Sequence, residues 1–190
     1  MKRRIVLCLG LVALFAVPVL AQEGQDQEAA MKAWMESAKA GPSHKMLADM
    51  AGTWEVNATS YDNPKSPTTS KGSAVKTMMM DGRFLKEELT REMMGMPFNG
   101  FGITGFNNTT RKFETIWLDS MGTMIMTGSG EGENGTCTVL MDFVDPMSKQ
   151  KMTAKGVTKV VDANKHVYTM YLMVGGKEMK TMEAEYIRKK

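Results

Sequence analysis

From Trp54 to the end of the chain, polar and apolar residues alternate in short runs that are separated by turn residues. In the first run Trp54, Val56 and Ala58 alternate with polar residues, which is the period-two pattern of a half-buried strand. Dipeptides typical of two-residue hairpin turns follow at Asp81-Gly82, Asn134-Gly135 and Gly175-Gly176. The pattern therefore predicts antiparallel strands joined by tight turns.

About ten strands are expected at the spacing that is typical of sandwiches and barrels. They are predicted at residues 54–59, 74–80, 83–92, 98–106, 112–119, 123–127, 137–143, 151–161, 166–174 and 178–188. Closure into a barrel removes exposed strand edges, which suits a chain without long covering helices. We expect an all-β fold, an antiparallel up-and-down β-barrel of about 8–10 strands, lipocalin-like, with a short N-terminal helical segment.

Before the strands, the period is helical. Residues 28–40 are predicted to form a helix that ends at Gly41-Pro42, and residues 22–26 a flexible leader. A second short helix is expected to start at Ser43, acting as its N-cap. It leads into Gly52-Thr53-Trp54, where the tryptophan can plug one end of the barrel while the glycine lets the backbone come close.

The first residues have the pattern of a signal peptide. Basic residues 2–4 precede an apolar run over residues 5–17 and the small-residue site Val19-Leu20-Ala21, so cleavage is predicted after Ala21. No second long apolar run follows, so no membrane span is expected after cleavage. The expected organisation is a signal peptide at residues 1–21, a leader and helix at 22–42 and one barrel domain at 43–190. The predicted localisation is periplasmic or secreted.

Cleavage changes the charge and the cysteine count. The 24 Lys and Arg residues include Lys2, Arg3 and Arg4, and their removal leaves 21 basic against 21 acidic residues. A near-neutral chain lacks the basic face that nucleic-acid binding needs, so no nucleic-acid partner is expected. Cys137 would be the one remaining cysteine and could form no internal disulfide. A monomer or a homodimer is compatible with this composition.

Seven stretches, in this order, resemble the DUF1579 family, a bacterial family of small, often secreted proteins known as a domain of unknown function. The resemblance covers about Gly41 to Lys190. It implies a barrel of the lipocalin or fatty-acid-binding type and brings no activity, substrate or catalytic residue. The stretches are 44–47, 51–55, 81–85, 95–98, 104–107, 117–123 and 182–188.

Methionine is the unusual residue in the composition, with 21 of 190. Its flexible, polarizable side chain can line an adaptable apolar cavity, although a soft core or compositional bias explains the same excess. The leading hypothesis is a barrel that binds a small apolar or amphipathic molecule. The predicted ligand-binding residues are Trp54, Phe84, Trp117, Asp119, Met124, Met126, Met170 and Tyr186.

A second hypothesis is a periplasmic Cu(I)-binding protein, because thioethers are soft ligands. Met94 with Met96, or Met124 with Met126, would share a strand face. Against copper, these methionines alternate within strands as core residues do. Two histidines cannot form a three-histidine site, and neither a metal ligand set nor a cofactor is assigned.

A third hypothesis is an enzyme that acts on a small molecule, with Asp119, Glu183 or His166 as acid or base. No Gly-x-Ser-x-Gly motif and no phosphate-binding glycine loop occurs, and no catalytic residue is assigned. His166 is expected at an exposed strand edge, and His44 in a helix cap or at the surface. Glu183 is expected on a solvated outer face.

Overall fold

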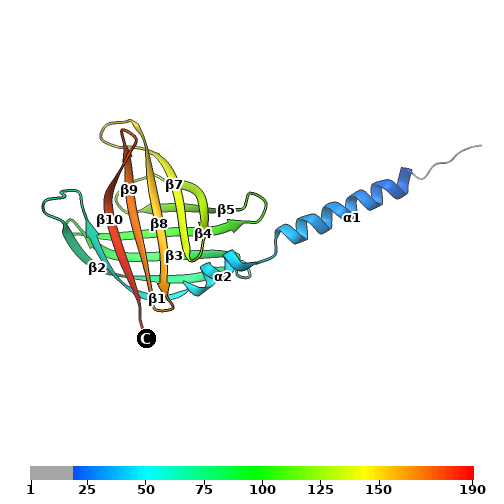
Figure 1. The fold of residues 1–190 in the computed structure, drawn as a ribbon, viewed down its shortest axis with the longest axis horizontal. Helices are drawn as coiled ribbons and strands as arrows, with labels where there is room; N and C mark the ends of the chain where they lie inside the picture. The colour runs from blue at the N-terminus through cyan, green and yellow to red at the C-terminus, as the bar shows by residue number, and fades with distance from the viewer. Residues whose placement is uncertain (1–18) are drawn as a thin grey trace, which may run out of the picture. The chain divides into compact units, whose positions relative to one another are not determined.

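The computed structural model describes residues 19–190, in two units (Figure 1). The first unit ends at Glu36 and contains most of helix α1 (Val19–Ser37), and the second extends from Ser37 to Lys190. Most of the predicted signal peptide therefore lies outside the described residues. Among the described helices, none has the length and apolar character needed to cross a bilayer.

The second unit contains one helix and ten strands, which together form the barrel and its cap. Their bounds are α2 (Pro42–Asp49), β1 (Gly52–Ser60), β2 (Thr68–Met79), β3 (Phe84–Met93), β4 (Met96–Asn107), β5 (Lys112–Asp119), β6 (Met126–Glu133), β7 (Thr136–Val144), β8 (Lys151–Asp162), β9 (Lys165–Val174) and β10 (Lys177–Arg188).

Every strand pairs antiparallel with its neighbours in the chain, and β1 also pairs with β10, which closes the sheet into a barrel. In that last pairing Val56 lies opposite Tyr186 and Ala58 opposite Ala184. The described barrel therefore has no free edge strand. The predicted all-β, up-and-down barrel is confirmed, with ten strands.

Alternation along the strands sends one set of side chains into the barrel. On β1 Trp54, Val56 and Ala58 are buried, and on β10 Ala184 and Tyr186 are buried. The acidic residues that alternate with these two on β10 face outward, as expected: Glu183 pairs with Lys180 and Glu185 with Lys165. The period-two pattern thus identified the inner face of both closing strands.

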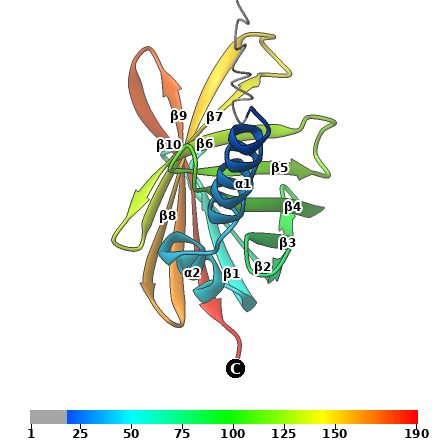
Figure 2. The ribbon, with the colours of Figure 1, turned by 90° about the vertical axis from the view of Figure 1, so that its right-hand side faces the viewer.

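Helix α2 covers one end of the barrel, next to the start of β1 (Figure 2). Leu47 of this helix and Met50, the C-cap residue that follows it, are buried in a core cluster with Leu85 and Phe113. Its N-cap is Gly41, whose backbone N–H donates to Nδ1 of His44 at 3.0 Å. The predicted Ser43 cap is therefore wrong, since the helix begins one residue earlier at Pro42 and an imidazole takes the capping role.

The up-and-down order gives the barrel two different ends. The turns β2–β3, β4–β5, β6–β7 and β8–β9 lie at the end covered by α2, which we call the closed end. The turns β1–β2, β3–β4, β5–β6, β7–β8 and β9–β10 lie at the opposite end, which we call the mouth. Figure 1 shows the β7–β8 and β9–β10 hairpins at the side of the barrel away from α2.

Three predicted elements differ from the structure. Strand β2 begins at Thr68 and not at Ala74. Helix α1 begins at Val19 and not at Glu28, so the expected leader at residues 22–26 is helical. Its Gln, Glu and Ala residues form helix readily without an apolar stripe, which is why periodicity missed it. Strand β6 runs over Met126–Glu133 and not over 123–127. It places Gly128, Gly130 and Gly132 where a Cβ would collide with β7, so the strand has little side-chain pattern to read.

Arg188 fastens the two chain ends of the barrel unit together at Gly52-Thr53-Trp54. Its guanidinium donates to the carbonyls of Asp49, Ala51 and Ala163 at 2.6–2.7 Å, and lies 4.1 Å from the Trp54 ring centre. Gly52 has φ +138°, and a Cβ there would collide with the guanidinium. The indole N–H of Trp54 donates to the Met50 carbonyl at 3.0 Å. The tryptophan thus closes this end, and the glycine makes room for Arg188.

Replacing Arg188 with alanine is expected to lower the free energy of unfolding by about 2–3 kcal/mol, because three carbonyls lose a charged donor and Trp54 loses its cation. Arg83→Ala is the control: its ion pair with Asp81 is exposed, so the expected loss is at most about 1 kcal/mol. Urea denaturation measures both. Equal losses in the two variants would contradict the role of Arg188.

Candidate functional site

The barrel encloses a cavity of about 330 Å³. Its volume is at the lower end of the range for small-molecule sites. Most of its wall is apolar and comes from β3 through β10. The apolar lining consists of Leu85, Leu89, Met93, Phe98, Trp117, Met121, Met126, Val139, Met141, Met170 and Met182.

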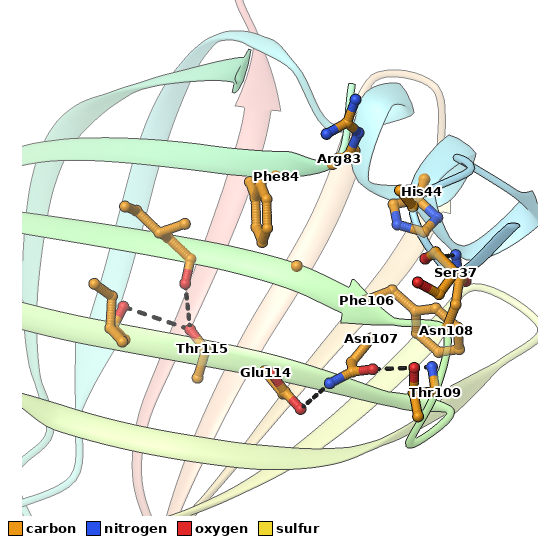
Figure 3. Close-up of a pocket in the computed structure, with 14 residues that line it drawn as sticks. Ser37, His44, Arg83, Phe84, Phe106, Asn107, Asn108, Thr109, Glu114 and Thr115 are labelled. Carbon is orange, nitrogen blue, oxygen red and sulfur yellow. Dashed lines mark hydrogen bonds between the residues drawn. The ribbon is translucent and has the colours of Figure 1, made fainter. Parts of the chain in front are cut away.

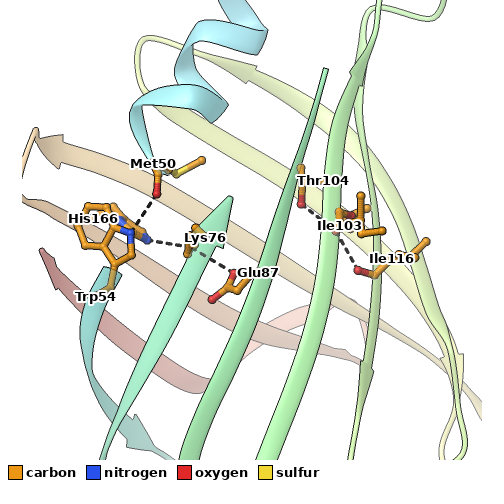
Figure 4. A network of polar contacts seen from close by, with 9 residues as sticks. Met50, Trp54, Lys76, Glu87, Ile103, Thr104, Ile116 and His166 are labelled. Carbon is orange, nitrogen blue, oxygen red and sulfur yellow. Dashed lines mark hydrogen bonds and ion pairs between the residues drawn. The ribbon is translucent and has the colours of Figure 1, made fainter. Parts of the chain in front are cut away.

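A buried ion pair lies in the cavity wall (Figure 4). The ammonium of Lys76, on β2, is 3.2 Å from a carboxylate oxygen of Glu87 on β3 and 3.0 Å from Nε2 of His166 on β9. Both strands turn these side chains inward, because Lys76 and Glu87 are direct cross-strand partners. Lys76 and His166 are almost fully buried, so their polar groups depend on one another and not on bulk water.

Aromatic rings enclose this cluster. The Tyr186 ring stacks on His166 with centres 4.4 Å apart, and the Trp54 ring meets His166 edge-on at 4.3 Å. The Lys76 ammonium lies 4.2 Å from the centre of the Tyr186 ring. Burial raises the pKa of Tyr186 well above its usual value, and the Glu87 carboxylate raises it further. The phenol therefore keeps its proton.

His166 is uncharged in the folded protein. Burial, together with the smaller effects of the charges of Lys76 and Arg188, lowers its pKa to about 2. Because an ammonium only donates, Nε2 of His166 accepts from Lys76 and the ring proton is on Nδ1. The predicted exposed edge position of His166 is therefore wrong, since the side chain is 1% exposed.

Two polar atoms of the cluster have no hydrogen-bond partner among the described residues. They are Nδ1 of His166 and Oε1 of Glu87, and both are buried. With the proton assignment above, one is a donor and the other an acceptor. A buried polar atom without a partner costs about 1–3 kcal/mol, so a bound group that satisfies either atom would gain that free energy.

Arg91 lies in the cavity wall further along β3, toward the mouth. Its guanidinium donates to Oγ of Ser70 at 3.2 Å and to the thioether sulfurs of Met93 and Met182 at 3.3 and 3.6 Å. Thioethers are weak acceptors, and no described carboxylate forms an ion pair with Arg91. Burial lowers the pKa of Arg91, and the charges of Asp119 and Asp62 offset only part of that effect, so a ligand that accepts hydrogen bonds would stabilise its charge.

Asp119 lies near the mouth and has its oxygens occupied. It accepts from the Trp117 indole N–H and from the Met121 backbone N–H, both at 3.0 Å. The carboxylate therefore orients the Trp117 ring against the glycines of β4: a Cβ at Gly100 or Gly102 would collide with that ring. Its position makes Asp119 a wall residue that orders Trp117.

A second hollow of about 450 Å³ lies on the outer face of the barrel (Figure 3). Phe84, Ile103 and Ile116 form its apolar floor, with Arg83, His44 and Glu114 around it. The amide of Asn108 donates to the carbonyls of Ser37 and Lys39 and holds that segment at the rim of the hollow. No buried unpartnered polar atom lies in this hollow.

The structure brings five of the eight predicted ligand-binding residues to the cavity wall, namely Trp117, Asp119, Met126, Met170 and Tyr186. Trp54 is buried behind His166, Phe84 faces the outer hollow, and Met124 is exposed in the β5–β6 turn. Binding by any of the eight remains a prediction.

The sequence analysis did not predict the charged residues of the site. Lys76 lies between Ala74 and Met78 at the inward positions of β2, and Glu87 lies between Leu85 and Leu89 on β3. The available signal was one charged residue between two apolar residues on the same face of a strand. It is a weak one, because the neighbouring strand positions are charged as well.

For the copper-binding and enzyme hypotheses, the described residues form no cluster of the required side chains. Among residues 19–190 no group of three His, Cys, Asp or Glu side chains could hold a metal. The thioethers of Met93 and Met182 do converge, but on the positive charge of Arg91. Glu183 faces outward, and no hydrogen bond joins Asp119 to His166. Copper binding and catalysis therefore remain predictions.

Three comparisons place the chain among known proteins. The family described as "Protein of unknown function (DUF1579)" matches residues 39–188. No curated protein matches the chain.

Two solved structures resemble the chain at low identity. The crystal structure of Rv2717c from M. tuberculosis has a TM-score of 0.55 at 15% identity, covering 80% of this chain and all of that one. The S-type phycobiliprotein lyase CPES from Guillardia theta has a TM-score of 0.52 at 8% identity, covering 82% and 96%. At these identities the likeness concerns the fold.

We expect the neutral His166 to make stability depend on pH. The pKa of His166 is lower in the folded protein than in the unfolded chain. Below about pH 6.5 the unfolded chain therefore binds a proton at His166 that the folded protein does not bind, so the free energy of unfolding falls as the pH decreases. From pH 6 to pH 5 the loss should approach about 1.4 kcal/mol. Urea denaturation across this range should show a flatter dependence for His166→Gln, whereas His44→Gln should keep the steep one. An unchanged slope in His166→Gln would contradict the assignment.

Proposed function

We propose that this chain, which belongs to the DUF1579 family of proteins of unknown function, binds a small amphipathic organic anion inside its barrel. The carrying observation is the enclosed cavity of about 330 Å³ in whose wall two buried polar atoms, Oε1 of Glu87 and Nδ1 of His166, have no partner. Native proteins satisfy nearly all buried polar groups, so such a pair supports a ligand that supplies the missing donor and acceptor.

The charge distribution supports an anionic group near the mouth. Lys76 is already compensated by Glu87, whereas Arg91 has a hydroxyl and two thioethers as its partners. A carboxylate or sulfonate on the ligand would replace the thioethers with a charge-assisted hydrogen bond. The apolar part of the ligand would then lie against Leu89, Val139 and Met126.

The ligand class can be tested with anilinonaphthalene sulfonate, an aromatic sulfonate whose fluorescence rises in apolar surroundings. We expect saturable binding at one site, weakened about tenfold or more in Arg91→Met because the charged donor is lost. Lys86→Met is the matched control, since Lys86 lies on the outer face of the same strand and pairs with Glu88.

A cavity-filling variant, Leu89→Trp, locates the site. It should abolish probe binding if the probe enters the barrel, and circular dichroism checks that the variant is folded. Unchanged binding in Leu89→Trp would show that the probe binds elsewhere, and unchanged binding in Arg91→Met alone would contradict anion recognition. Native mass spectrometry of protein from its own host would then identify a bound natural ligand.

We also infer that the protein acts outside the cytoplasm, after cleavage following Ala21. Basic residues 2–4, the apolar run 5–17 and the small residues Val19 and Ala21 support this.

Cleavage predicts that protein recovered from its host begins at Gln22 and is found in the periplasmic or extracellular fraction. Intact-mass measurement of each fraction tests both points. An Ala21→Arg variant, which removes the small residue before the cut, should accumulate uncleaved. Recovery of the full-length chain from the cytoplasm would contradict the proposal.

A further inference from the structure

Strand β3 carries two charged side chains into the cavity at different depths. Glu87, Leu89 and Arg91 alternate along the strand, and all three line the cavity wall. Because β3 begins at the closed end and finishes at the mouth, Glu87 lies deeper in the barrel than Arg91. Four residues separate the two, which is about 13 Å along a strand. The wall is therefore polar at two separate levels.

The wall between these two levels is apolar. Leu89 lies halfway between the two charged residues, and its cross-strand partners are Ala74 on β2 and Gly100 on β4. The ring of Trp117 covers Gly100, since a Cβ at that glycine would collide with the indole. A guest that contacts both levels is therefore expected to carry a hydrocarbon stretch between two polar ends.

The level nearer the mouth suits an anion. Arg91 donates to the hydroxyl of Ser70 and to two thioether sulfurs, which are weak acceptors. Asp119, which also lines the cavity, has both of its oxygens engaged in hydrogen bonds. A ligand carboxylate at Arg91 would gain a charge-assisted hydrogen bond, as the proposed function requires.

The deeper level suits a neutral hydrogen-bond donor. The Lys76 ammonium already has three partners, which are the Glu87 carboxylate, the His166 ring and the Tyr186 ring. With its N–H groups so engaged, the ammonium offers none to a ligand anion. Oε1 of Glu87, by contrast, is a buried acceptor without a partner among the described residues. A ligand hydroxyl would donate to that oxygen, whereas a second carboxylate would be repelled by its charge.

We propose that the ligand is a medium-chain hydroxy acid, with its carboxylate on Arg91 and a hydroxyl at its far end on Glu87. The inference rests on the proposed binding of an organic anion and adds the second polar group and its distance from the first. The separation along β3 matches an extended chain of about ten carbons. A terminal hydroxyl both donates and accepts, which suits a level where Oε1 of Glu87 lacks a donor and Nδ1 of His166 lacks an acceptor.

Isothermal titration calorimetry of the full chain with three ten-carbon acids tests the ligand class. We expect 10-hydroxydecanoate to bind at least about fivefold more tightly than decanoate, because a buried acceptor gains a donor. Decanedioate should bind at least about tenfold more weakly than 10-hydroxydecanoate, because its second carboxylate faces Glu87. The hydroxyl should add no affinity in the shorter pair, 6-hydroxyhexanoate and hexanoate, which cannot reach both levels.

A charge change at Glu87 should invert this order. Glu87→Gln leaves Lys76 without its counter-ion, so decanedioate should bind the variant more tightly than 10-hydroxydecanoate does and should raise its melting temperature further. Glu88→Gln is the matched control and should keep the wild-type order, since Glu88 lies on the outer face of the same strand and pairs with Lys86. If Glu87→Gln does not fold, the wild-type series decides the proposal by itself.

The outcomes separate this inference from the proposed function. Equal binding of decanoate and 10-hydroxydecanoate by the wild type, or of decanedioate and 10-hydroxydecanoate, would overturn the inference. So would a folded Glu87→Gln variant that keeps the wild-type order. If anilinonaphthalene sulfonate binds inside the barrel and none of the acids binds, the inference fails and the proposed function stands. If neither the sulfonate nor any acid binds, both fail.

Discussion

A buried lysine inside a closed barrel is the constraint on which the site depends. An unpaired ammonium in that environment would cost several kcal/mol, so Lys76 requires both Glu87 and a neutral acceptor in His166. His166 meets that requirement because burial keeps its imidazole uncharged, with the Tyr186 ring stacked on it and the Trp54 ring edge-on to it. It also leaves one atom of Glu87 and one of His166 without a partner, which makes the cavity wall chemically specific.

The two ends of the barrel differ in the contacts that their chain segments make. At the closed end, backbone carbonyls left by α2 and by the β8–β9 turn are gathered by one guanidinium, that of Arg188, with Trp54 beneath it. At the mouth, no comparable clamp joins the described turns, and apolar side chains face outward. The closed end is thus held by buried and charge-assisted contacts, whereas the mouth presents apolar side chains to its surroundings.

The sequence predicted the strands because alternation and turn dipeptides are local signals. Trp54 and Val56, predicted as the apolar side of a half-buried strand, and Tyr186, predicted to line the barrel interior, are all buried. The site was harder to predict, because its charged side chains point into the barrel, whereas the prediction assumes that inward positions are apolar. Lys76, Glu87 and Arg91 look like outer-face residues until the register pairs them, and His166 is buried only because β9 places it beside Trp54. The bounds of β6 were predicted wrongly for a different reason: its three glycines have no side chains, so the strand shows no alternation of polar and apolar residues.

Methionine serves two roles in this chain, and the structure separates them by position. Met93, Met126, Met141, Met170 and Met182 line the cavity, where flexible side chains allow the wall to fit different guests. Met94 and Met147 are exposed at the mouth, and Met147 lies in a turn closed by hydrogen bonds from Lys149 N–H to Asp145 O and from Asp145 N–H to Gln150 O. Exposed apolar side chains gathered at one end of a barrel favour a partner that covers them. Met93 and Met121 extend the cavity wall to this end, so a partner that covered the mouth would lie next to the cavity and away from the charged cluster around Lys76.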